Sequence, residues 1–209
     1  MIFRLNDHLI FPDPMLAEPD GLLAIGGNLS TERLLLAYSN GIFPWYNDGE
    51  PVHWYAPYER FVLFPHEMLI SKSMANILKK GKFQITSNQS FEQVITACSN
   101  IKRKGQNGTW ITDEMKKAYL KLHVEGYAHS VEVWEMDKLV GGLYGVIVNK
   151  VFCGESMFTL VPNASKVALI QLVKSNLFKL IDCQVHTNHL ESMGAKMIPR
   201  DEYLSILRS

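Results

Sequence analysis

A glutamate lies inside an apolar run near the middle of this 209-residue chain. Glu155 stands between Gly154 and Ser156 in the segment VFCGESMF, whose apolar residues are typical of a buried strand. An ionised carboxylate is costly to bury unless a partner compensates its charge or a reaction uses it. The simplest alternative is a glutamate at the end of a strand that faces water.

Four glycines in the same region favour a site over that alternative. Glycine inside a strand often marks a bulge or a place where a ligand approaches the backbone. The glycines are Gly141, Gly142, Gly145 and Gly154. We therefore expect this region to form the floor of a site, with Glu155 as a candidate functional residue.

The element that must position Glu155 is a β-hairpin. Two strand-like runs, LVGGLYGVIV and VFCGESMF, are joined by the polar pair Asn149 and Lys150, which is the length of a two-residue hairpin turn. The segment His129–Glu135 (HSVEVWE) precedes them and alternates polar with apolar residues. Three antiparallel strands are therefore expected side by side.

The remaining sequence predicts two domains. Residues 1–60 are rich in proline, glycine and aromatic residues, which predicts a small N-terminal domain of turns and short elements. One helix is expected there, at Glu32–Ser39, with Ser30 or Thr31 as its N-cap. Residues 61–209 alternate between strand and helix patterns and form the larger domain.

Periodicity and capping residues predict further elements of the larger domain around the three central strands. They are a strand Arg60–Phe64, a helix Ser71–Lys80, a strand Phe83–Thr86, helices Phe91–Ser99 and Thr112–Glu125, a helix of about four turns capped by Asn163 or Ser165, a strand Leu180–Val185 and a short helix Glu191–Ala195 before a C-terminal tail. Met115, Tyr119 and Leu122 share one face of the Thr112–Glu125 helix, and we interpret that face as core.

These elements predict an α/β (α+β) protein in which a mixed, largely antiparallel sheet comes after the small N-terminal domain. The order of the elements matches the acetyltransferase-like (GNAT-like) fold, which has three antiparallel strands, a helix, a further strand and a short helix. A fold alone does not define a function. Coenzyme A users of that fold bind the pyrophosphate on a glycine-rich turn before the helix. The corresponding turn here, residues 159–165, has no glycine, and Pro162 lacks an N–H donor, so CoA binding is not expected.

Composition limits the other classes of function. Apolar residues make up 47% and charged residues 20% of the chain, as in ordinary folded proteins, and the formal net charge is zero. Nucleic acid must therefore be bound by a local patch. The three cysteines are an odd number without metal-ligand spacing, so we expect reduced, buried thiols. We expect neither a metal nor a cofactor. With no signal sequence or membrane-spanning run, the protein is expected to be cytoplasmic and to have no membrane partner.

Lys102, Arg103 and Lys104 form a short basic run before Trp110. A solvated loop and a contact to phosphate are equally reasonable interpretations of this run.

The chain resembles the leucyl/phenylalanyl-tRNA–protein transferases over nearly its whole length. The segments that carry the resemblance are DGLLAIGGNLS, LLLAYSNGIFPWY, GTWIT, AHSVEVW, LVGGLYGV, FCGESMF, NASKVAL and LIDCQV. The resemblance implies an aminoacyltransferase that moves Leu, Phe or, less readily, Met from aminoacyl-tRNA onto a protein whose first residue is Arg or Lys, and so marks it for degradation. Its partners would be charged tRNA and such proteins.

The ester of a charged tRNA is already activated, so the enzyme must mainly orient an amine and manage one proton. Asp182 and Gln184 are two apart on a predicted strand and so are expected on one face, with Cys183 on the other. We hypothesise that Asp182 orients Gln184, that Gln184 contacts the attacking amine, and that Glu155 holds the cationic acceptor or fixes the aminoacyl group. The proton could instead pass through the tRNA ribose hydroxyl. A solvated strand end is the simpler interpretation of the Asp182 and Gln184 pair.

The resemblance also implies residues that bind the aminoacyl end of tRNA. Tyr38, Trp45 and Trp110 match positions where aromatic rings can stack on the terminal adenine. Candidates for the apolar side-chain pocket are Leu143, Phe152, Met157, Leu172 and Ile181, for which ordinary core packing is the alternative. Leu143 and Leu172 stand where better-known members are expected to have Met and Phe, so pocket width and the preference among Leu, Phe and Met stay open.

Three other functions compete with this interpretation. A cell-wall aminoacyl-tRNA ligase would need a second domain of the same fold, and an N-acetyltransferase is opposed by the turn without glycine. A non-catalytic protein that binds aminoacyl-tRNA ends, or a degradation adaptor, would leave the GESMF and DCQ clusters without a role.

Overall fold

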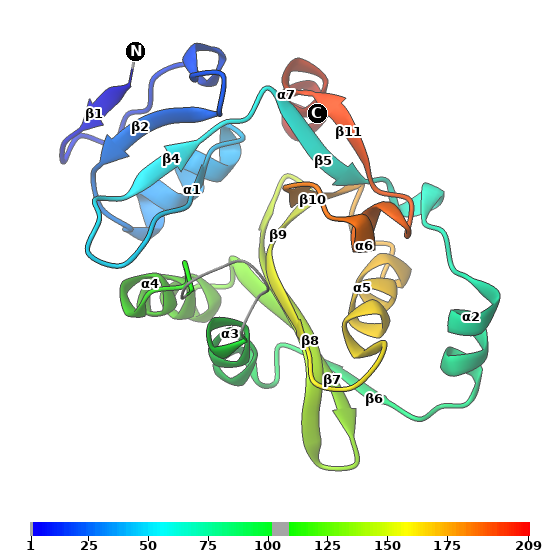
Figure 1. The fold of residues 1–209 in the computed structure, drawn as a ribbon. Helices are drawn as coiled ribbons and strands as arrows, with labels where there is room; N and C mark the ends of the chain where they lie inside the picture. Colours follow the sequence, from blue (N-terminus) through cyan, green and yellow to red (C-terminus); the bar gives the residue numbers. More distant parts are fainter. Residues whose placement is uncertain (1, 102–108) are drawn as a thin grey trace.

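The computed structural model describes residues 2–101 and 109–209 of the protein. The basic run at Lys102, Arg103 and Lys104 lies outside these ranges, so its phosphate contact stays a prediction. Two sheets form within the described residues, one of four strands near the N-terminus and one of seven strands (Figure 1).

The smaller sheet has the order β1-β2-β4-β3, with β1 and β2 parallel and the other pairs antiparallel. Its strands are β1 (Phe3–Leu5), β2 (Leu22–Gly26), β3 (Phe43–Pro44) and β4 (His53–Tyr55). The helix α1 (Thr31–Ser39) confirms the expected helix, and the Ser30 hydroxyl caps it by accepting from the backbone N–H of Arg33. Trp54 is fully buried, and its indole N–H donates to the Gly26 carbonyl, which ties β4 to the end of β2.

The larger sheet has the order β11-β5-β10-β9-β8-β7-β6. Its strands are β5 (Glu59–Leu63), β6 (Gln84–Ser87), β7 (Ala128–Glu135), β8 (Lys138–Val148), β9 (Val151–Thr159), β10 (Leu180–Gln184) and β11 (Lys196–Pro199). Neighbouring strands are antiparallel except β9 and β10, which are parallel. The mixed α/β class and the largely antiparallel sheet are therefore confirmed, and β7, β8, β9, α5, β10 and α6 have the order expected of the acetyltransferase-like fold.

The central hairpin is confirmed together with its turn. Asn149 and Lys150 both have positive φ, 48° and 61°, as the two central residues of a type I′ turn require. The glycines of the hairpin, however, make room for neighbouring groups of the protein itself. A Cβ at Gly145 would clash with the Cys153 carbonyl oxygen and lie 2.7 Å from the Phe152 ring, so no larger residue fits there. At Gly141 the neighbour is Ala164 of α5.

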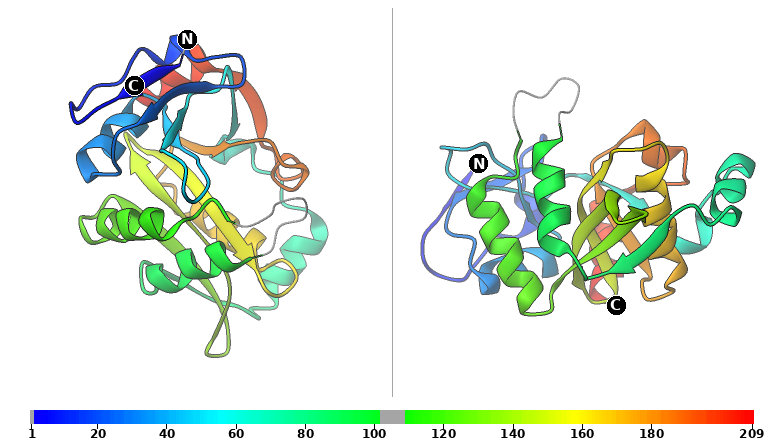
Figure 2. Two further views of the ribbon diagram at one scale, coloured as in Figure 1. Left: turned by 60° about the vertical axis from the view of Figure 1, so that its left-hand side comes forward. Right: turned by 90° about the horizontal axis from the view of Figure 1, so that it is seen from below.

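Helices cover both faces of the larger sheet (Figure 2). α5 (Ala164–Lys174) packs on one face, and α3 (Phe91–Asn100) and α4 (Asp113–Val124) pack on the other. α2 (Lys72–Lys79) comes after β5 and buries Met74. Of the two expected caps of α5, Asn163 and Ser165, Asn163 is at the N-cap position, but its φ is 73° and its side chain makes no capping hydrogen bond. The helix has 11 residues, about one turn fewer than expected.

The C-terminal prediction was wrong in two ways. The short helix is α6 (Asn188–Glu191), one turn earlier than Glu191–Ala195, because the Thr187 hydroxyl caps it by accepting from the Leu190 N–H. The expected tail forms the edge strand β11 and the helix α7 (Arg200–Arg208), which packs on β11 and β5. A four-residue strand such as β11 is recognisable only from its pairing with β5.

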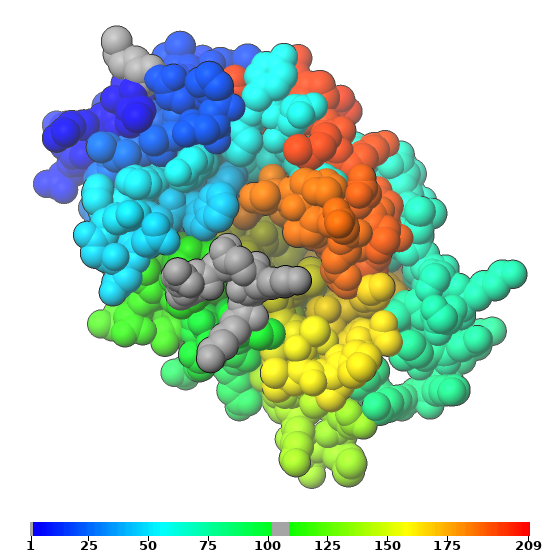
Figure 3. Space-filling view, in the orientation of Figure 1, coloured from blue at the N-terminus to red at the C-terminus, as the bar shows by residue number. Residues whose placement is uncertain are grey.

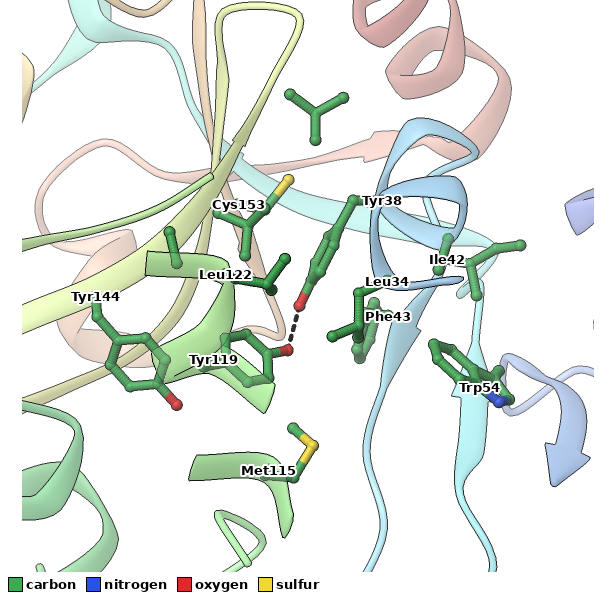
Figure 4. Close-up of a cluster of buried hydrophobic side chains, with 14 of the residues drawn as sticks. Leu34, Tyr38, Ile42, Phe43, Trp54, Met115, Tyr119, Leu122, Tyr144 and Cys153 are labelled. Atoms are coloured by element: carbon green, nitrogen blue, oxygen red, sulfur yellow. Dashed lines mark hydrogen bonds between the residues drawn. The ribbon is translucent and has the colours of Figure 1, made fainter. Parts of the chain in front are cut away.

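The two sheets share one hydrophobic core. Tyr38 and Trp54 from the first 60 residues belong to the same cluster as Tyr119, Tyr144 and others from the larger sheet and its helices (Figure 4). On the surface, residues of the cyan segment around β3 and β4 lie against the orange segment around β10 and α6 (Figure 3). The division at residue 60 stays a prediction, since the packing joins the two parts.

Candidate active site

A cavity of about 420 Å³ lies where β9 and β10 separate. The two strands pair only from Leu180 with Val151 to Asp182 with Cys153. Beyond that point the strands diverge, and residues of β9, β10, α5 and α6 line the space between them. Glu155, Asp182 and Gln184 all border this cavity, so the structure brings the three predicted catalytic residues together.

Glu155 is 7% exposed and accepts three hydrogen bonds. The Tyr38 hydroxyl donates to Oε1 at 2.7 Å, the Tyr119 hydroxyl donates to Oε2 at 3.0 Å, and the Gln184 Nε2 donates to Oε1 at 2.8 Å. The glutamate is thus buried inside the molecule, and the interpretation of a water-facing strand end is wrong for Glu155.

Tyr38 and Tyr119 also lie within hydrogen-bond distance of each other, as Figure 4 shows for the side chains from α1 and α4. Three contacts therefore join Tyr38, Tyr119 and Glu155. The two hydroxyl hydrogens can fill only two of these contacts. If Glu155 is protonated, its carboxyl hydrogen fills the third by donating to one tyrosine oxygen, and that tyrosine then donates to the other tyrosine. This geometry favours the neutral carboxylic acid when the cavity holds no charged ligand.

The electrostatic surroundings of Glu155 lead to the same conclusion. Burial raises the pKa of Glu155 to about 7, although the hydrogen bonds from Tyr38, Gln184 and Tyr119 act in the opposite direction. Burial and the neighbouring Glu155 also raise the pKa values of Tyr38 and Tyr119 well above the usual value of a tyrosine, so both hydroxyls remain protonated donors. Glu155 can therefore change its charge near neutral pH.

Asp182 is fully buried and bound on both carboxylate oxygens. The Arg60 Nε donates to Oδ1 and Oδ2 at 2.9 and 3.0 Å, and its second terminal nitrogen donates to Oδ2 at 2.8 Å. The Tyr203 hydroxyl donates to Oδ2 at 2.8 Å, and the Gln184 backbone N–H donates to Oδ1 at 2.8 Å. Asp182 therefore contacts the backbone of Gln184 and leaves the amide side chain of that residue free to reach Glu155.

The strict alternation expected along β10 does not hold. The pairing of β10 with β5 shifts between Asp182 and Gln184, and Gln184 has a φ of 61°. Cys183 packs against the hydrophobic cluster that contains Ile181, whereas Asp182 reaches Tyr203 of the other cluster, and residues 182–184 all contribute to the cavity lining. A register shift of this kind has no signal in the sequence LIDCQV.

The five predicted pocket residues all line the cavity. Leu143, Phe152, Leu172 and Ile181 are at most 6% exposed, and Met157 is half-buried. Phe152 and Leu172 are thus both core residues and cavity walls, so the two interpretations of these positions do not exclude each other.

The three predicted aromatic residues differ in position. Trp45, 39% exposed, and Trp110, half-buried, line the cavity and can offer a ring face to a ligand. Tyr38 is 1% exposed and is not among the cavity-lining residues. Its contact with the site is the hydrogen bond to Glu155, so it supports that carboxylate.

Sequence reasoning missed three residues of this network. Tyr119 looked like a core residue on an amphipathic helix, Arg60 like the first residue of a strand, and Tyr203 lay in the expected tail. Their hydroxyl or guanidinium groups reach Glu155 or Asp182 from distant parts of the chain. An arginine in an otherwise apolar strand pattern, RFVLF, was the one signal available, and it did not identify the partner.

An apolar cavity with two tryptophans on its wall and a buried carboxylate–amide pair inside has the features of an enzyme site that binds an apolar substrate and places a few polar groups against it. The profile of the family "Leucyl/phenylalanyl-tRNA protein transferase" matches residues 62–208, and the profile of its N-terminal domain matches residues 27–57. The chain belongs to this family of aminoacyltransferases.

Similar proteins span the whole chain. The leucyl/phenylalanyl-tRNA–protein transferase of Flavobacterium johnsoniae is 54% identical and covers 100% of both chains. That of Flavobacterium psychrophilum is 54% identical over 98% of each chain. That of Syntrophus aciditrophicus is 56% identical and covers 99% of this chain and 88% of its own.

Solved structures resemble this one only weakly. L-PGS from Bacillus licheniformis aligns with a TM-score of 0.40 and 13% identity over 79% of this chain and 54% of its own. A GCN5-related N-acetyltransferase from Kribbella flavida aligns with a TM-score of 0.41 and 10% identity over 79% and 59%. Within residues 2–101 and 109–209, no helix is long and apolar enough to cross a membrane.

Proposed function

We propose that the protein transfers Leu, Phe and, less readily, Met from aminoacyl-tRNA to the α-amino group of proteins that begin with Arg or Lys. The observation that carries this proposal is the position of Glu155, a carboxylate able to ionise near pH 7 at the wall of a mostly apolar cavity. The apolar walls suit the aminoacyl side chain, and the carboxylate suits a cationic acceptor. Because charged tRNA is the donor, the proposed location is the cytoplasm.

The donor would bind with its apolar side chain between β9 and α5. Leu143, Leu172 and Ile181 form apolar walls there, and Trp45 and Trp110 are available for stacking on the terminal adenine. A site that holds the amino acid and one nucleotide in this way depends little on the rest of the tRNA sequence. Its selectivity would come from the shape of the apolar cavity.

The acceptor would bind with its cationic first residue against Glu155. A cation close to a carboxylate favours the ionised form, so binding of Arg or Lys would release the proton that Glu155 holds in the empty site. The same contact disfavours an acceptor that begins with a neutral residue, because it would leave Glu155 without a cation. Charge complementarity thus supports the proposed acceptor class.

In the transfer step, the nitrogen of the α-amino group attacks the ester carbonyl carbon. A C–N amide bond forms, the C–O bond to the tRNA ribose breaks, and one proton passes from the amine to the departing ribose oxygen. The side-chain nitrogen of Gln184 is bonded to Glu155, so the atom that Gln184 can offer to the amine hydrogen is Oε1. An α-amino group titrates near pH 8, so orientation rather than a strong base is the main requirement.

The test is transfer of radiolabelled Leu, Phe and Met from charged tRNA to peptides that differ only in a first residue of Arg, Lys or Ala. Transfer to Arg and Lys peptides, lost in Glu155→Ala and retained in Glu135→Ala, would support the proposal. Glu135 is a matched control because it is a carboxylate of β7 that does not line the cavity. Transfer that ignores the first residue would contradict the acceptor assignment.

Absence of transfer by folded protein would contradict the whole proposal. Binding of charged tRNA without transfer would then favour the alternative function, a non-catalytic protein that binds aminoacyl-tRNA ends or acts as a degradation adaptor.

A further inference from the structure

Gln184 leaves the regular path of its strand in an unfavourable backbone conformation. Its φ of 61° lies in the left-handed region, which a residue with a long side chain seldom occupies unless the surroundings hold it. The pairing of β10 with β5 shifts at the same place. This bulge directs the Gln184 amide across the gap to Glu155 on β9, which it meets at 2.8 Å.

The group that holds this conformation is the Asp182 carboxylate. Its Oδ1 accepts the Gln184 backbone N–H at 2.8 Å, a bond that bridges the bulge within one strand. The carboxylate can do so only while it is itself fixed, and its fixing groups come from other elements. Arg60 of β5 forms a bidentate ion pair with it, and Tyr203 of α7 donates a further hydrogen bond.

Arg60 is in turn held between two aromatic rings. The centre of its guanidinium lies 4.6 Å from the Phe43 ring of β3 and 4.7 Å from the Tyr203 ring. Arg60 is 2% exposed and Tyr203 is 1% exposed, so neither can exchange its partner for water. The ion pair therefore connects the N-terminal sheet, the C-terminal helix and the bulge of β10.

We propose that Arg60 and Tyr203 are positioning residues of the transfer reaction, which act through Asp182 to hold the Gln184 bulge and so aim the Gln184 amide into the cavity. This inference rests on the proposed function. It assigns Asp182 to orientation and not to proton transfer, because both of its oxygens are already occupied by donors of the protein. Neither Arg60 nor Tyr203 lines the cavity, so their effect on the substrates is indirect.

The charged and titratable groups around Asp182 determine the effect of removing Arg60. They are Arg60 on β5, Tyr203 on α7, Cys153 and Glu155 on β9, and Cys183 on β10 itself. Arg60 is the cation of this group. Without it, the buried carboxylate loses its compensating charge and the two donor groups that fix its orientation, so its hydrogen bond to the Gln184 N–H is no longer held in place.

The experiment compares Tyr203→Phe, Arg60→Gln and a matched control, Arg200→Gln. Arg200 is also buried and lies on α7, but its guanidinium donates to the Ala56 carbonyl and not to a carboxylate. For each variant, single-turnover transfer is measured between pH 6 and 9, together with the KM for charged tRNA and the melting temperature. Tyr203→Phe removes one hydroxyl and keeps the ring beside Arg60, so it tests the inference even if Arg60→Gln does not fold.

We expect Tyr203→Phe to lower kcat roughly tenfold, the equivalent of one hydrogen bond to a charged group, while the KM for charged tRNA changes less than about twofold. Arg60→Gln should lower kcat further, because it removes the bidentate ion pair that fixes the Asp182 carboxylate. Arg200→Gln should lose thermal stability but keep the wild-type kcat and pH profile per folded molecule.

Two outcomes would overturn the inference. First, Tyr203→Phe and Arg60→Gln could show the same kcat and pH profile as Arg200→Gln. Tyr203 and Arg60 would then have only a structural role. If wild type itself transfers nothing, the proposed function is wrong. The effect of Tyr203 on the bulge can then still be measured from the NMR resonances of the Gln184 backbone and side-chain amides. Resonances unchanged in Tyr203→Phe would then show that Tyr203 does not hold the bulge.

Discussion

Glu155→Gln should change how the stability of the protein depends on pH. An unfolded Glu ionises near pH 4.5, whereas burial raises the pKa of Glu155 in the folded protein to about 7. Between these two values the native state keeps a proton that the unfolded chain has lost. The contribution of Glu155 to the stability of the wild type therefore falls as the pH rises through this window. The interval from 4.5 to about 7 corresponds to about 3 kcal/mol at 1.36 kcal/mol per pH unit.

Urea unfolding of wild type and Glu155→Gln at several pH values between 4 and 8.5 measures this effect. Gln184, Tyr38 and Tyr119 can still meet the neutral amide, so the variant keeps the packing but never carries the charge. Its free energy of unfolding relative to wild type should rise by about 3 kcal/mol from the acid end of the window to the alkaline end. All other titrating groups are common to both proteins and cancel in the difference. A constant difference across the window would refute the assignment of a neutral, buried Glu155.

The same substitution separates two ionisations in the transfer reaction. In wild type, the rate should rise with pH as Glu155 ionises near pH 7 and again as the acceptor amine loses its proton near pH 8. Glu155→Gln should retain only the second rise and should bind Arg and Lys acceptors more weakly. A profile unchanged by the substitution would mean that Glu155 does not meet the acceptor.

The cavity and the hairpin can be tested at three further positions. Trp45→Ala should weaken binding of charged tRNA by about 1–3 kcal/mol, the usual contribution of one stacked base, and a filter-binding titration would measure it; unchanged affinity would exclude stacking on this ring. Leu172→Phe should narrow the pocket and lower transfer of Phe relative to Leu by about 1–3 kcal/mol. A competition between the two charged tRNAs would measure the ratio, and an unchanged ratio would mean that the aminoacyl side chain binds elsewhere. Gly145→Ala should lower the free energy of unfolding by about 1–3 kcal/mol, because its Cβ would clash with the Cys153 carbonyl oxygen. A melting temperature equal to wild type would contradict that last prediction.

Local signals in the sequence were sufficient for most of the elements near the site. The pair Asn149 and Lys150 predicts the turn of the hairpin because a two-residue loop between strand patterns leaves few alternatives. Ser30 and Thr112 mark the starts of α1 and α4 because a hydroxyl at an N-cap satisfies a backbone N–H of the first turn. These interactions span only a few residues, so a sequence pattern records them fully.

Elements that depend on distant partners were predicted poorly. β11 exists because it pairs with β5, and α7 exists because Tyr203, Leu204 and Leu207 find a core to pack against. The glycines of β8 and β9 illustrate the same limit. Their number indicated a close approach, but only the structure identifies the approaching groups as Ala164, Phe152 and neighbouring backbone.

By itself, the sequence determined the family, the hairpin that carries Glu155 and the apolar residues of the pocket. Tertiary structure alone decided which groups surround Glu155 and Asp182. Tyr38 lies 117 positions from Glu155, and Arg60 lies 122 positions from Asp182, so no local pattern relates them. The ionisation of a carboxylate depends on its burial and on the donors within hydrogen-bond distance. Both quantities arise only when the chain folds and brings α1, α4, β5 and α7 around the separation of β9 and β10.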